Sequence, residues 1–312
     1  PLPPQRNPFM NTITSVILAA RPKTLPAGLV AVWAGCLIVH KFEQALPGSG
    51  IALNLPLALY TALSCMCIQI ACNFFNDSID AQRRADTPKR QGPRRITASG
   101  AMSARAVKLW GCAFLLGACG FAIPLIQAQG WPILAIGIPS LFFAYGYTGG
   151  PYPLAYHGLG ELFVLLFFGL VAVTGTVFVQ LGWQTAYTPI YCAAVCMGII
   201  CGLLSCLLIE VNNIRDRRED AETGKRTLAV RLGESRARGL AMAFLVAPYA
   251  VIGQLFRLVP GLGWNLCWAA AILVAGIFLV KLHTTPANKK MNVMLGLASL
   301  HMILYLTALT IG

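Results

Sequence analysis

Two groups of acidic and amide side chains, each at the end of a long apolar stretch, are the part of this sequence best suited to chemistry. The first group is Asn73, Asn76, Asp77, Asp80 and Asp86, and the second is Asp216 and Asp220. If a helix continues through each group, the spacing brings most of these side chains to one face. Carboxylates that share a helix face repel each other, so the arrangement calls for a cation between them. Oxygen ligands without His or Cys favour a hard ion, and Mg²⁺ is usually held by a few carboxylates together with substrate phosphates.

Basic residues follow both acidic groups. They are Arg83, Arg84, Lys89, Arg90, Arg94 and Arg95 after the first group, and Lys225, Arg226 and Arg231 after the second. A diphosphate would use both charges, because Mg²⁺ links it to the acids while Arg and Lys bind its free oxygens. The alternative is that the acids only balance basic loops at a membrane surface, as exposed ion pairs of little consequence. Two groups in matching positions favour the diphosphate site.

The composition indicates an all-α, polytopic membrane protein. Of 312 residues, 57% are hydrophobic and only 11% are charged, whereas about a quarter of a soluble protein is charged. Apolar stretches long enough to cross a bilayer, which takes about 20 helical residues, predict nine transmembrane helices. They lie near residues 15–40, 54–76, 106–126, 131–148, 161–181, 188–211, 240–256, 264–281 and 291–311. We expect one transmembrane domain over residues 13–312. Residues 1–12 are expected to form an N-terminal tail that is partly non-native, with Met10 as one candidate for the native start.

The distribution of Lys and Arg predicts the orientation. An odd number of spans puts the termini on opposite sides, and cytoplasmic loops carry an excess of basic residues. The N-terminal segment and the connections after the second, sixth and eighth stretches hold 21 of the 24 Lys and Arg residues. We therefore expect a multi-pass protein of the plasma membrane with a cytoplasmic N-terminus and an external C-terminus. Nucleic acid binding is not needed to explain the net charge of +13, and the sequence does not identify any protein partner.

Both acidic groups border the long polar connections, at about residues 77–105 and 212–239. We expect both connections to be loops on the cytoplasmic side, since loops of such length are usually binding loops or lids. Their positions after the second and sixth apolar stretches place the two acidic groups on the same side of the membrane.

The acidic groups resemble the signatures of the UbiA superfamily of intramembrane prenyltransferases. Asn76, Asp80 and Asp86 match its Asn-x3-Asp-x5-Asp pattern, and Asp216 and Asp220 match its Asp-x3-Asp pattern. Further stretches resemble the branch that prenylates 1,4-dihydroxy-2-naphthoate in menaquinone synthesis. These are Arg21-Pro-Lys23-Thr-Leu-Pro26, Gly92-Pro-Arg94-Arg95, Tyr147-Thr-Gly-Gly150, Gly158-Leu-Gly-Glu161, and Asn212-Asn213-x-Arg215-Asp216 through Gly224-Lys225-x-Thr227-Leu.

The resemblance implies a fold, a cofactor and a set of site residues. The fold is nine helices around a central cavity, with Mg²⁺ at its cytoplasmic mouth and a lateral opening to the bilayer. The implied metal ligands are Asn76, Asp77, Asp80, Asp86, Asp216 and Asp220, with Asp80, Asp216 and Asp220 essential for catalysis. The implied substrate-binding residues are Arg21, Lys23, Asn73, Asn76, Arg83, Lys89, Arg94, Arg95, Tyr147, Asn212, Asn213, Arg215 and Lys225.

Several of these residues have a second interpretation. Arg21 and Lys23 would bind either the carboxylate of the acceptor or the diphosphate, and a cytoplasmic anchor also explains them. Tyr147 departs from many family members, because no cation follows it closely, and an interfacial tyrosine is the alternative. Glu161 would be costly in lipid, yet at the start of a helix it would suit the helix dipole.

The function implied is transfer of a polyprenyl group from polyprenyl diphosphate to 1,4-dihydroxy-2-naphthoate, with decarboxylation to demethylmenaquinone. The alternatives within the family are another aromatic acceptor, such as homogentisate or 4-hydroxybenzoate, or a phytyl donor. A transporter is disfavoured, because transporters carry polar groups near the bilayer midplane, whereas the centres of these apolar stretches carry almost no ionisable residues.

Overall fold

The computed structural model describes residues 12–87, 90–93 and 95–312, and within these ranges all regular structure is helical. The principal helices are α1 Thr12–Ala20, α2 Pro26–Ala45, α3 Leu55–Gln82, α4 Ala104–Gln129, α5 Pro132–Gly146, α6 Gly160–Val164, α7 Ala172–Leu181, α8 Thr188–Glu222, α9 Leu228–Leu258, α10 Cys267–Thr284 and α11 Asn292–Ile311. A π-helical segment, Leu165–Val171, joins α6 to α7. Most of the expected N-terminal tail, and also Lys89 and Arg94, lie outside the described residues.

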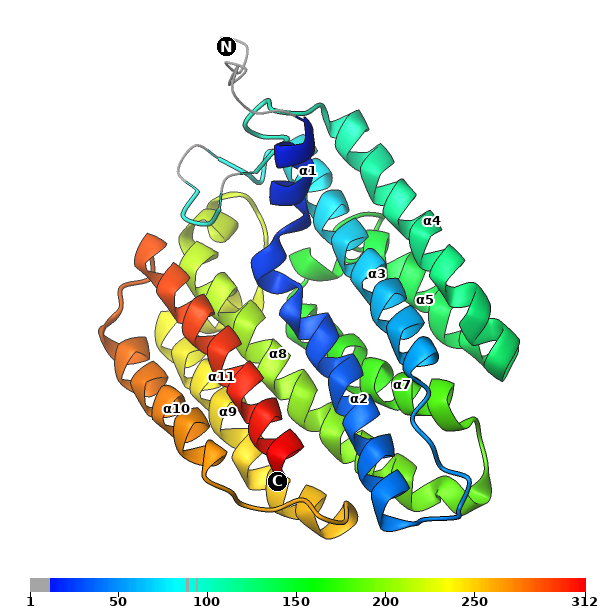
Figure 1. Ribbon diagram of the computed structural model, residues 1–312. Coiled ribbons are helices and arrows are strands. Elements are labelled where there is room, and N and C mark those ends of the chain that lie inside the picture. Colours follow the sequence, from blue (N-terminus) through cyan, green and yellow to red (C-terminus); the bar gives the residue numbers. More distant parts are fainter. Residues whose placement is uncertain (1–11, 88–89, 94) are drawn as a thin grey trace.

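The helices run side by side between two ends of the molecule (Figure 1). The described residues of the loop between α3 and α4, which are 83–87, 90–93 and 95–103, lie at the same end as α1, and so does the connection between α8 and α9. The connections 46–54, 182–187 and 259–266 lie at the opposite end with the C-terminus. The two acidic groups therefore belong to one end of the bundle.

Seven helical segments of the described chain are long and apolar enough to cross a membrane. They are Leu55–Gln82, Ala104–Gln129, Gly160–Leu181, Thr188–Glu222, Leu228–Leu258, Cys267–Thr284 and Lys289–Ile311. An eighth apolar helix, Pro132–Gly146, is shorter. A multi-pass helical architecture is thus confirmed, while the count of nine spans stays a prediction.

The first predicted span, residues 15–40, is interrupted in the structure. α1 ends at Ala20, Arg21 has a φ of 52°, and α2 begins at Pro26 after a 3₁₀ turn. Pro22 disfavours a helical conformation at the residue before it, which explains a break at Arg21. Asn73 of α3 donates a hydrogen bond of 2.9 Å to the carbonyl of Ala20 and so satisfies the end of α1.

The expectation of a long loop at residues 212–239 is wrong. α8 continues to Glu222 and α9 begins at Leu228, with Thr227 as its N-cap. Hydropathy marks only the part of a helix that lies in the bilayer, so it missed these polar extensions. Gly224, with a φ of 79°, ends α8 in the left-handed conformation that glycine adopts readily. α3 also continues to Gln82, so Asn73, Asn76, Asp77 and Asp80 of the first acidic group lie on a helix, while Asp86 lies in the loop beyond it.

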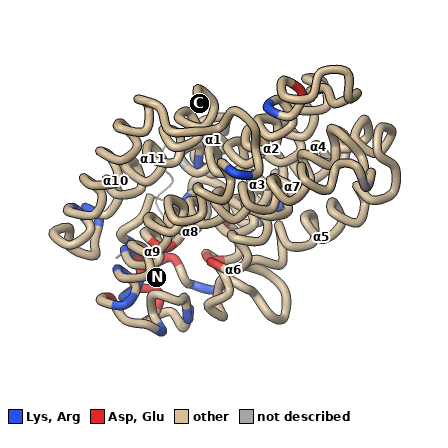
Figure 2. Tube along the Cα trace, turned by 90° about the horizontal axis from the view of Figure 1, so that it is seen from below, with Lys and Arg blue, Asp and Glu red and all other residues tan. Residues whose placement is uncertain are grey.

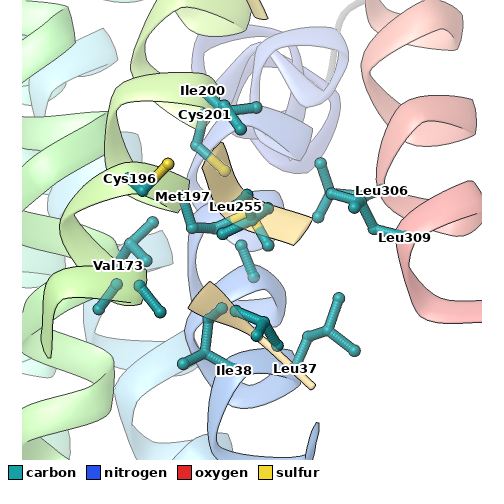
Figure 3. Close-up of a cluster of buried hydrophobic side chains, with 14 of the residues drawn as sticks. Leu37, Ile38, Val173, Cys196, Met197, Ile200, Cys201, Leu255, Leu306 and Leu309 are labelled. Atoms are coloured by element: carbon teal, nitrogen blue, oxygen red, sulfur yellow. The ribbon is translucent and has the colours of Figure 1, made fainter. Parts of the chain in front are cut away.

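The apolar core surrounds α8, and 67% of its most apolar 18-residue stretch is buried. Figure 3 shows part of this core, in which side chains from several helices meet. It includes Leu37 and Ile38 of α2, Val173 of α7, Met197, Ile200 and Cys201 of α8, Leu255 of α9, and Leu306 and Leu309 of α11. Because α8 is fixed along its length by this packing, the acids beyond its apolar part have a defined position.

Small residues let α8 approach the π-helical segment closely. A Cβ atom at Gly202 would lie 2.9 Å from the backbone oxygen of Leu165, and one at Gly198 would lie 3.0 Å from the Cα atom of Leu170. Helices in membranes commonly use glycine at such contacts.

We expect Gly202→Ala to destabilise the protein, because the new methyl group meets backbone that cannot rotate away. The expected loss in unfolding free energy is about 1–3 kcal/mol, the usual cost of overpacking, measured by denaturant unfolding in detergent. Gly276→Ala on α10 is the matched control, since nothing lies within 4 Å of its Cβ position. Equal stability of the two variants would contradict the close packing.

Candidate active site

Asp80 is the centre of the first acidic group. It lies near the end of α3, and only 2% of the residue is exposed. Its Oδ2 atom is 3.2 Å from Nη2 of Arg95 and 3.6 Å from Nζ of Lys225, and its Oδ1 atom accepts a hydrogen bond of 2.9 Å from the Tyr156 hydroxyl. A buried carboxylate needs such partners, because its charge is costly away from water.

Asp86 lies in the loop that follows α3. Its Oδ1 atom accepts hydrogen bonds from Arg90, at 2.6 Å, and from Arg95, at 3.3 Å. Its Oδ2 atom is buried and has no hydrogen-bond partner. Burial raises the pKa of Asp86 to about 7, although Arg90 acts in the opposite direction. This carboxylate therefore has a free buried oxygen and an incompletely compensated charge.

The second acidic group lies on the polar extension of α8. Asp216 accepts two hydrogen bonds from its neighbour Arg215, of 2.8 and 2.7 Å, and lies 3.9 Å from Nη2 of Arg90. Asp220 lies one turn later and is 9% exposed. Arg90 is thus between an acid of the first group and an acid of the second.

Lys225 joins the groups on the other side. Its ammonium group contacts Asp80 and lies 5.3 Å from the centre of the Tyr156 ring. Burial alone would lower the pKa of Lys225, but Asp80 and Asp220 outweigh burial, so the pKa lies above its ordinary value. The backbone N–H of Lys225 also donates to the carbonyl of Asp220, at 2.8 Å, which fixes the short connection.

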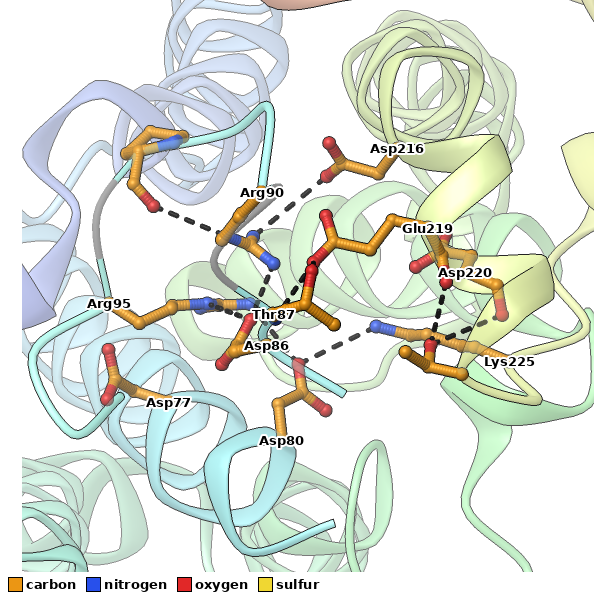
Figure 4. A network of polar contacts seen from close by, with 12 residues as sticks. Asp77, Asp80, Asp86, Thr87, Arg90, Arg95, Asp216, Glu219, Asp220 and Lys225 are labelled. Atoms are coloured by element: carbon orange, nitrogen blue, oxygen red, sulfur yellow. Dashed lines mark hydrogen bonds and ion pairs between the residues drawn. The ribbon is translucent and has the colours of Figure 1, made fainter. Parts of the chain in front are cut away.

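Figure 4 shows acids of both groups facing one another, with three cations among them. The cations are Arg90, Arg95 and Lys225. In the described part of the chain, no group of three or more His, Cys, Asp or Glu residues is arranged so that it could hold a metal ion by itself. The donor set nevertheless suits Mg²⁺, since all acids present oxygen and the buried Oδ2 atom of Asp86 lacks a partner. Mg²⁺ takes further oxygens from phosphates, so it needs few protein ligands.

Several predicted ligands have structural partners. Both carboxylate oxygens of Asp77 accept hydrogen bonds from backbone N–H groups, those of Ile96, at 3.0 Å, and Thr97, at 2.8 Å. Asn76 accepts a hydrogen bond from the Thr148 hydroxyl. The structure therefore uses Asp77 to hold the loop of residues 83–103 and Asn76 to hold the connection after α5.

The remaining predicted substrate-binding residues include an arginine near Tyr156 and two amides on α8. Arg83, which donates to the carbonyl of Gly150 at 3.2 Å, lies beside Tyr156 at the edge of the site. Asn212 donates to the Leu208 carbonyl of its own helix at 3.1 Å, and Asn213 donates to Glu161 at 2.6 Å. These two amides belong to the membrane side of the aspartates.

Arg21 has no hydrogen-bond partner for its buried Nη2 atom. Burial and the nearby Arg90 lower its pKa, while Asp77, Asp80 and Asp86 act to raise it, so the guanidinium lies within electrostatic reach of the first acidic group. Lys23 lies on the turn Pro22–Thr24 that follows. Tyr147 packs against Phe163, with ring centres 5.2 Å apart, instead of beside a cation.

Glu219 is a part of the site that the sequence analysis missed. It accepts hydrogen bonds from the backbone N–H of Thr87, at 2.9 Å, and from its hydroxyl, at 2.7 Å, and its other oxygen is buried without a partner. This contact ties the loop after α3 to α8. Its position three residues after Asp216 was the available signal, because that spacing shares a helix face.

Comparison with known proteins finds a matching family model and related proteins. The UbiA prenyltransferase family model matches residues 45–295. A Haemophilus influenzae protein named 1,4-dihydroxy-2-naphthoate octaprenyltransferase is 33% identical over 253 residues, which cover 79% of this chain and 78% of that protein.

Two solved structures share the fold. The apo structure of a UbiA homolog from Aeropyrum pernix K1 has a TM-score of 0.65 at 17% identity, and the match covers 92% of this chain and 98% of that chain. A UbiA homolog from Archaeoglobus fulgidus bound to GPP and Mg²⁺ has a TM-score of 0.56 at 13% identity, covering 95% of this chain and 99% of that chain. The present chain thus has a UbiA-like fold.

The hydrogen bonds of Asp77 and Asp80 predict different defects. We expect Asp77→Ala to speed hydrogen exchange at the amides of Ile96 and Thr97 by about fivefold, because each loses an acceptor worth on the order of 1 kcal/mol. Its Mg²⁺ affinity, measured by titration with a prenyl diphosphate present, should change little. Asp80→Asn should weaken Mg²⁺ binding and leave that exchange unchanged. Mg²⁺ binding that is equally weak in both variants would make Asp77 a ligand.

Proposed function

This chain belongs to the UbiA prenyltransferase family, and from that premise we propose that it transfers a polyprenyl group from its diphosphate to 1,4-dihydroxy-2-naphthoate. The observation that carries the proposal is the pair of facing carboxylate groups on α3 and α8 with Arg90, Arg95 and Lys225 among them. Such a site holds both the metal charge and the cations that a diphosphate requires.

Mg²⁺ would be held by Asp80, Asp86, Asp216 and Asp220, and it would supply positive charge to the departing diphosphate. The three cations now paired with these acids would turn to the diphosphate oxygens, because charge-assisted contacts to phosphate are strong. Lys89 and Arg94 remain candidates for the same role from the basic loop. The chain would in this way stabilise the charge that develops as the allylic C–O bond breaks.

The acceptor is proposed from two considerations. A relative that shares most of this chain is named for a dihydroxynaphthoate substrate, and Arg21 supplies a buried guanidinium atom without a partner. The acceptor's carboxylate would pair with Arg21, because an acid next to the aspartates needs a cation of its own. Loss of that carboxyl as CO₂ is part of the same proposal, and it gives demethylmenaquinol, the reduced form of demethylmenaquinone.

We also propose nine spans in one domain over residues 13–312. The segments α2 and α5 would complete the seven longer helices, and the carboxylate end of the bundle would face the cytoplasm of a cell with the protein in its plasma membrane. The basic residues concentrated at that end support this orientation.

The purified protein should convert a polyprenyl diphosphate and 1,4-dihydroxy-2-naphthoate to a prenylated, decarboxylated product only when Mg²⁺ is present. Asp80→Asn and Asp220→Asn should each lower kcat by more than about 100-fold, the scale of losing an electrostatic contact in the transition state. Product mass is the measurement. Glu43→Gln, far along α2, is the control.

Full activity in EDTA would overturn the metal assignment. Faster prenylation of homogentisate or 4-hydroxybenzoate than of the naphthoate would replace the acceptor, and faster use of phytyl diphosphate would replace the donor.

The orientation predicts which engineered cysteines are accessible from outside an intact cell. Ser49→Cys lies in the exposed connection after α2, and Arg218→Cys is exposed on the polar extension of α8. An impermeant thiol reagent should label Ser49→Cys in intact cells, and Arg218→Cys only after permeabilisation, with the unsubstituted protein as background control. The reverse pattern would invert the topology.

A further inference from the structure

Two glutamates from different helices are in contact on the membrane side of the aspartates. Glu161 is in the first turn of α6 and is 5% exposed, and Glu210 is on α8 and is fully buried. Glu161 packs against α8 at the level of Glu210. The Sγ atom of Cys206, four residues before Glu210, donates to the Glu161 carbonyl, and Asn213, three residues after Glu210, donates to Oε1 of Glu161. Glu210 precedes Asp216 by six residues, which corresponds to a rise of about 9 Å along the helix.

The pair has few partners. Asn213 donates a hydrogen bond of 2.6 Å to Oε1 of Glu161. Oε2 of Glu161 and both oxygens of Glu210 are buried and accept nothing. Neither glutamate forms a salt bridge within the part of the chain that the structure describes. Two adjacent buried carboxylates without a cation repel strongly, and one proton shared between them would relieve that repulsion.

The helix dipole explains the position of Glu161 but not that of Glu210. Glu161 is in the first turn of α6, where the helix dipole favours a negative charge. Glu210 lies well inside α8, which runs from Thr188 to Glu222, so no helix end compensates it. A buried acid next to another acid lowers stability. This cost favours a functional role for Glu210.

A group of aromatic side chains lies along the helical segment that begins with Glu161. Phe163 and Phe167, which follow Glu161 on the same helical segment, stack with ring centres 4.5 Å apart, and Phe143 of α5 lies 5.7 and 5.5 Å from them. The Tyr147 ring completes this group, and its hydroxyl would lie 3.0 Å from a Cβ atom at Gly160. All four aromatic residues are only partly buried. They offer ring faces on which a flat aromatic molecule would pack.

We propose that Glu161, sharing a proton with Glu210, accepts the proton of a ring hydroxyl of the aromatic acceptor. The inference rests on the proposed function and deepens it, since it names the group that activates the acceptor. The acceptor's ring would lie against Phe163 and Tyr147, with its reacting carbon towards the aspartates and its hydroxyl towards the free Oε2 atom of Glu161.

In the proposed reaction Glu161 takes up one proton and returns it at the end. The hydroxyl O–H bond breaks, and its proton forms a bond to Oε2 of Glu161. The electron pair left on oxygen makes the ring carbon that bears the carboxylate nucleophilic, and this carbon bonds to C1 of the prenyl group. The C1–O bond breaks, and its electron pair leaves with the diphosphate. Loss of CO₂ returns the electrons of the C–C bond to the ring, and the proton held by Glu161 returns to the ring oxygen.

The test compares Glu161→Gln, Glu210→Gln and the control Glu43→Gln with two acceptors. One is 1,4-dihydroxy-2-naphthoate, and the other is a naphthoate analogue whose ring hydroxyl is already ionised at the assay pH. Glu161→Gln should lower kcat for the first acceptor by about 10²–10⁴-fold, the range for a general base, and should lower it far less for the second. KM for the prenyl diphosphate and the Mg²⁺ requirement should not change, because the aspartate site is intact.

Equal losses with both acceptors, or no loss in Glu161→Gln, would overturn the proposal. A wild-type protein that prenylates neither naphthoate would refute the proposed function instead. The shared proton has its own readout, which needs no turnover: infrared spectra should show a protonated carboxyl band, sensitive to deuteration, that is missing from the double variant Glu161→Gln, Glu210→Gln. Absence of this difference band would overturn the proton-sharing pair whatever the activity.

Discussion

The attraction between the carboxylates of α3 and α8 and the cations that lie among them is the interaction on which the rest of the site depends. Asp80 and Asp86 are almost completely buried, and their charges would be costly without Arg95, Arg90 and Lys225. The same cations lie on the two connections that leave these helices. The connections that cover the site therefore also carry the cations that balance its charge.

Other contacts hold these groups in place. Asp77 binds the backbone of Ile96 and Thr97, and Glu219 binds Thr87, so the loop after α3 is held at two points. On the opposite side, Gly224 lets the chain turn so that Lys225 reaches Asp80. The helices themselves are positioned by the core around α8 (Figure 3). Charged groups accordingly gather in one region beside α8 and α9 (Figure 2).

Much of this could be predicted because membrane helices and acidic motifs leave strong signals. Each apolar stretch corresponds to a helix or a pair of helices, and the spacing of Asn73, Asn76, Asp77 and Asp80 fits the continuation of α3 to Gln82. The extension of α8 beyond the bilayer was missed, because its polar residues look like a loop to a hydropathy pattern. The anchoring role of Asp77 was also not readable, since its partners lie about 20 residues away along the chain and depend on the loop conformation.

Arg90 and Lys225 occupy the place where a metal-bound diphosphate would compete for the same carboxylates. A structure with Mg²⁺ and a non-reactive prenyl thiolodiphosphate tests it most directly. In that complex Asp80 and Asp86 should turn their oxygens to the metal, while Arg90 and Lys225 leave them and contact the diphosphate. A complex in which the Arg90–Asp86 and Lys225–Asp80 pairs persist, with the diphosphate bound elsewhere, would contradict it.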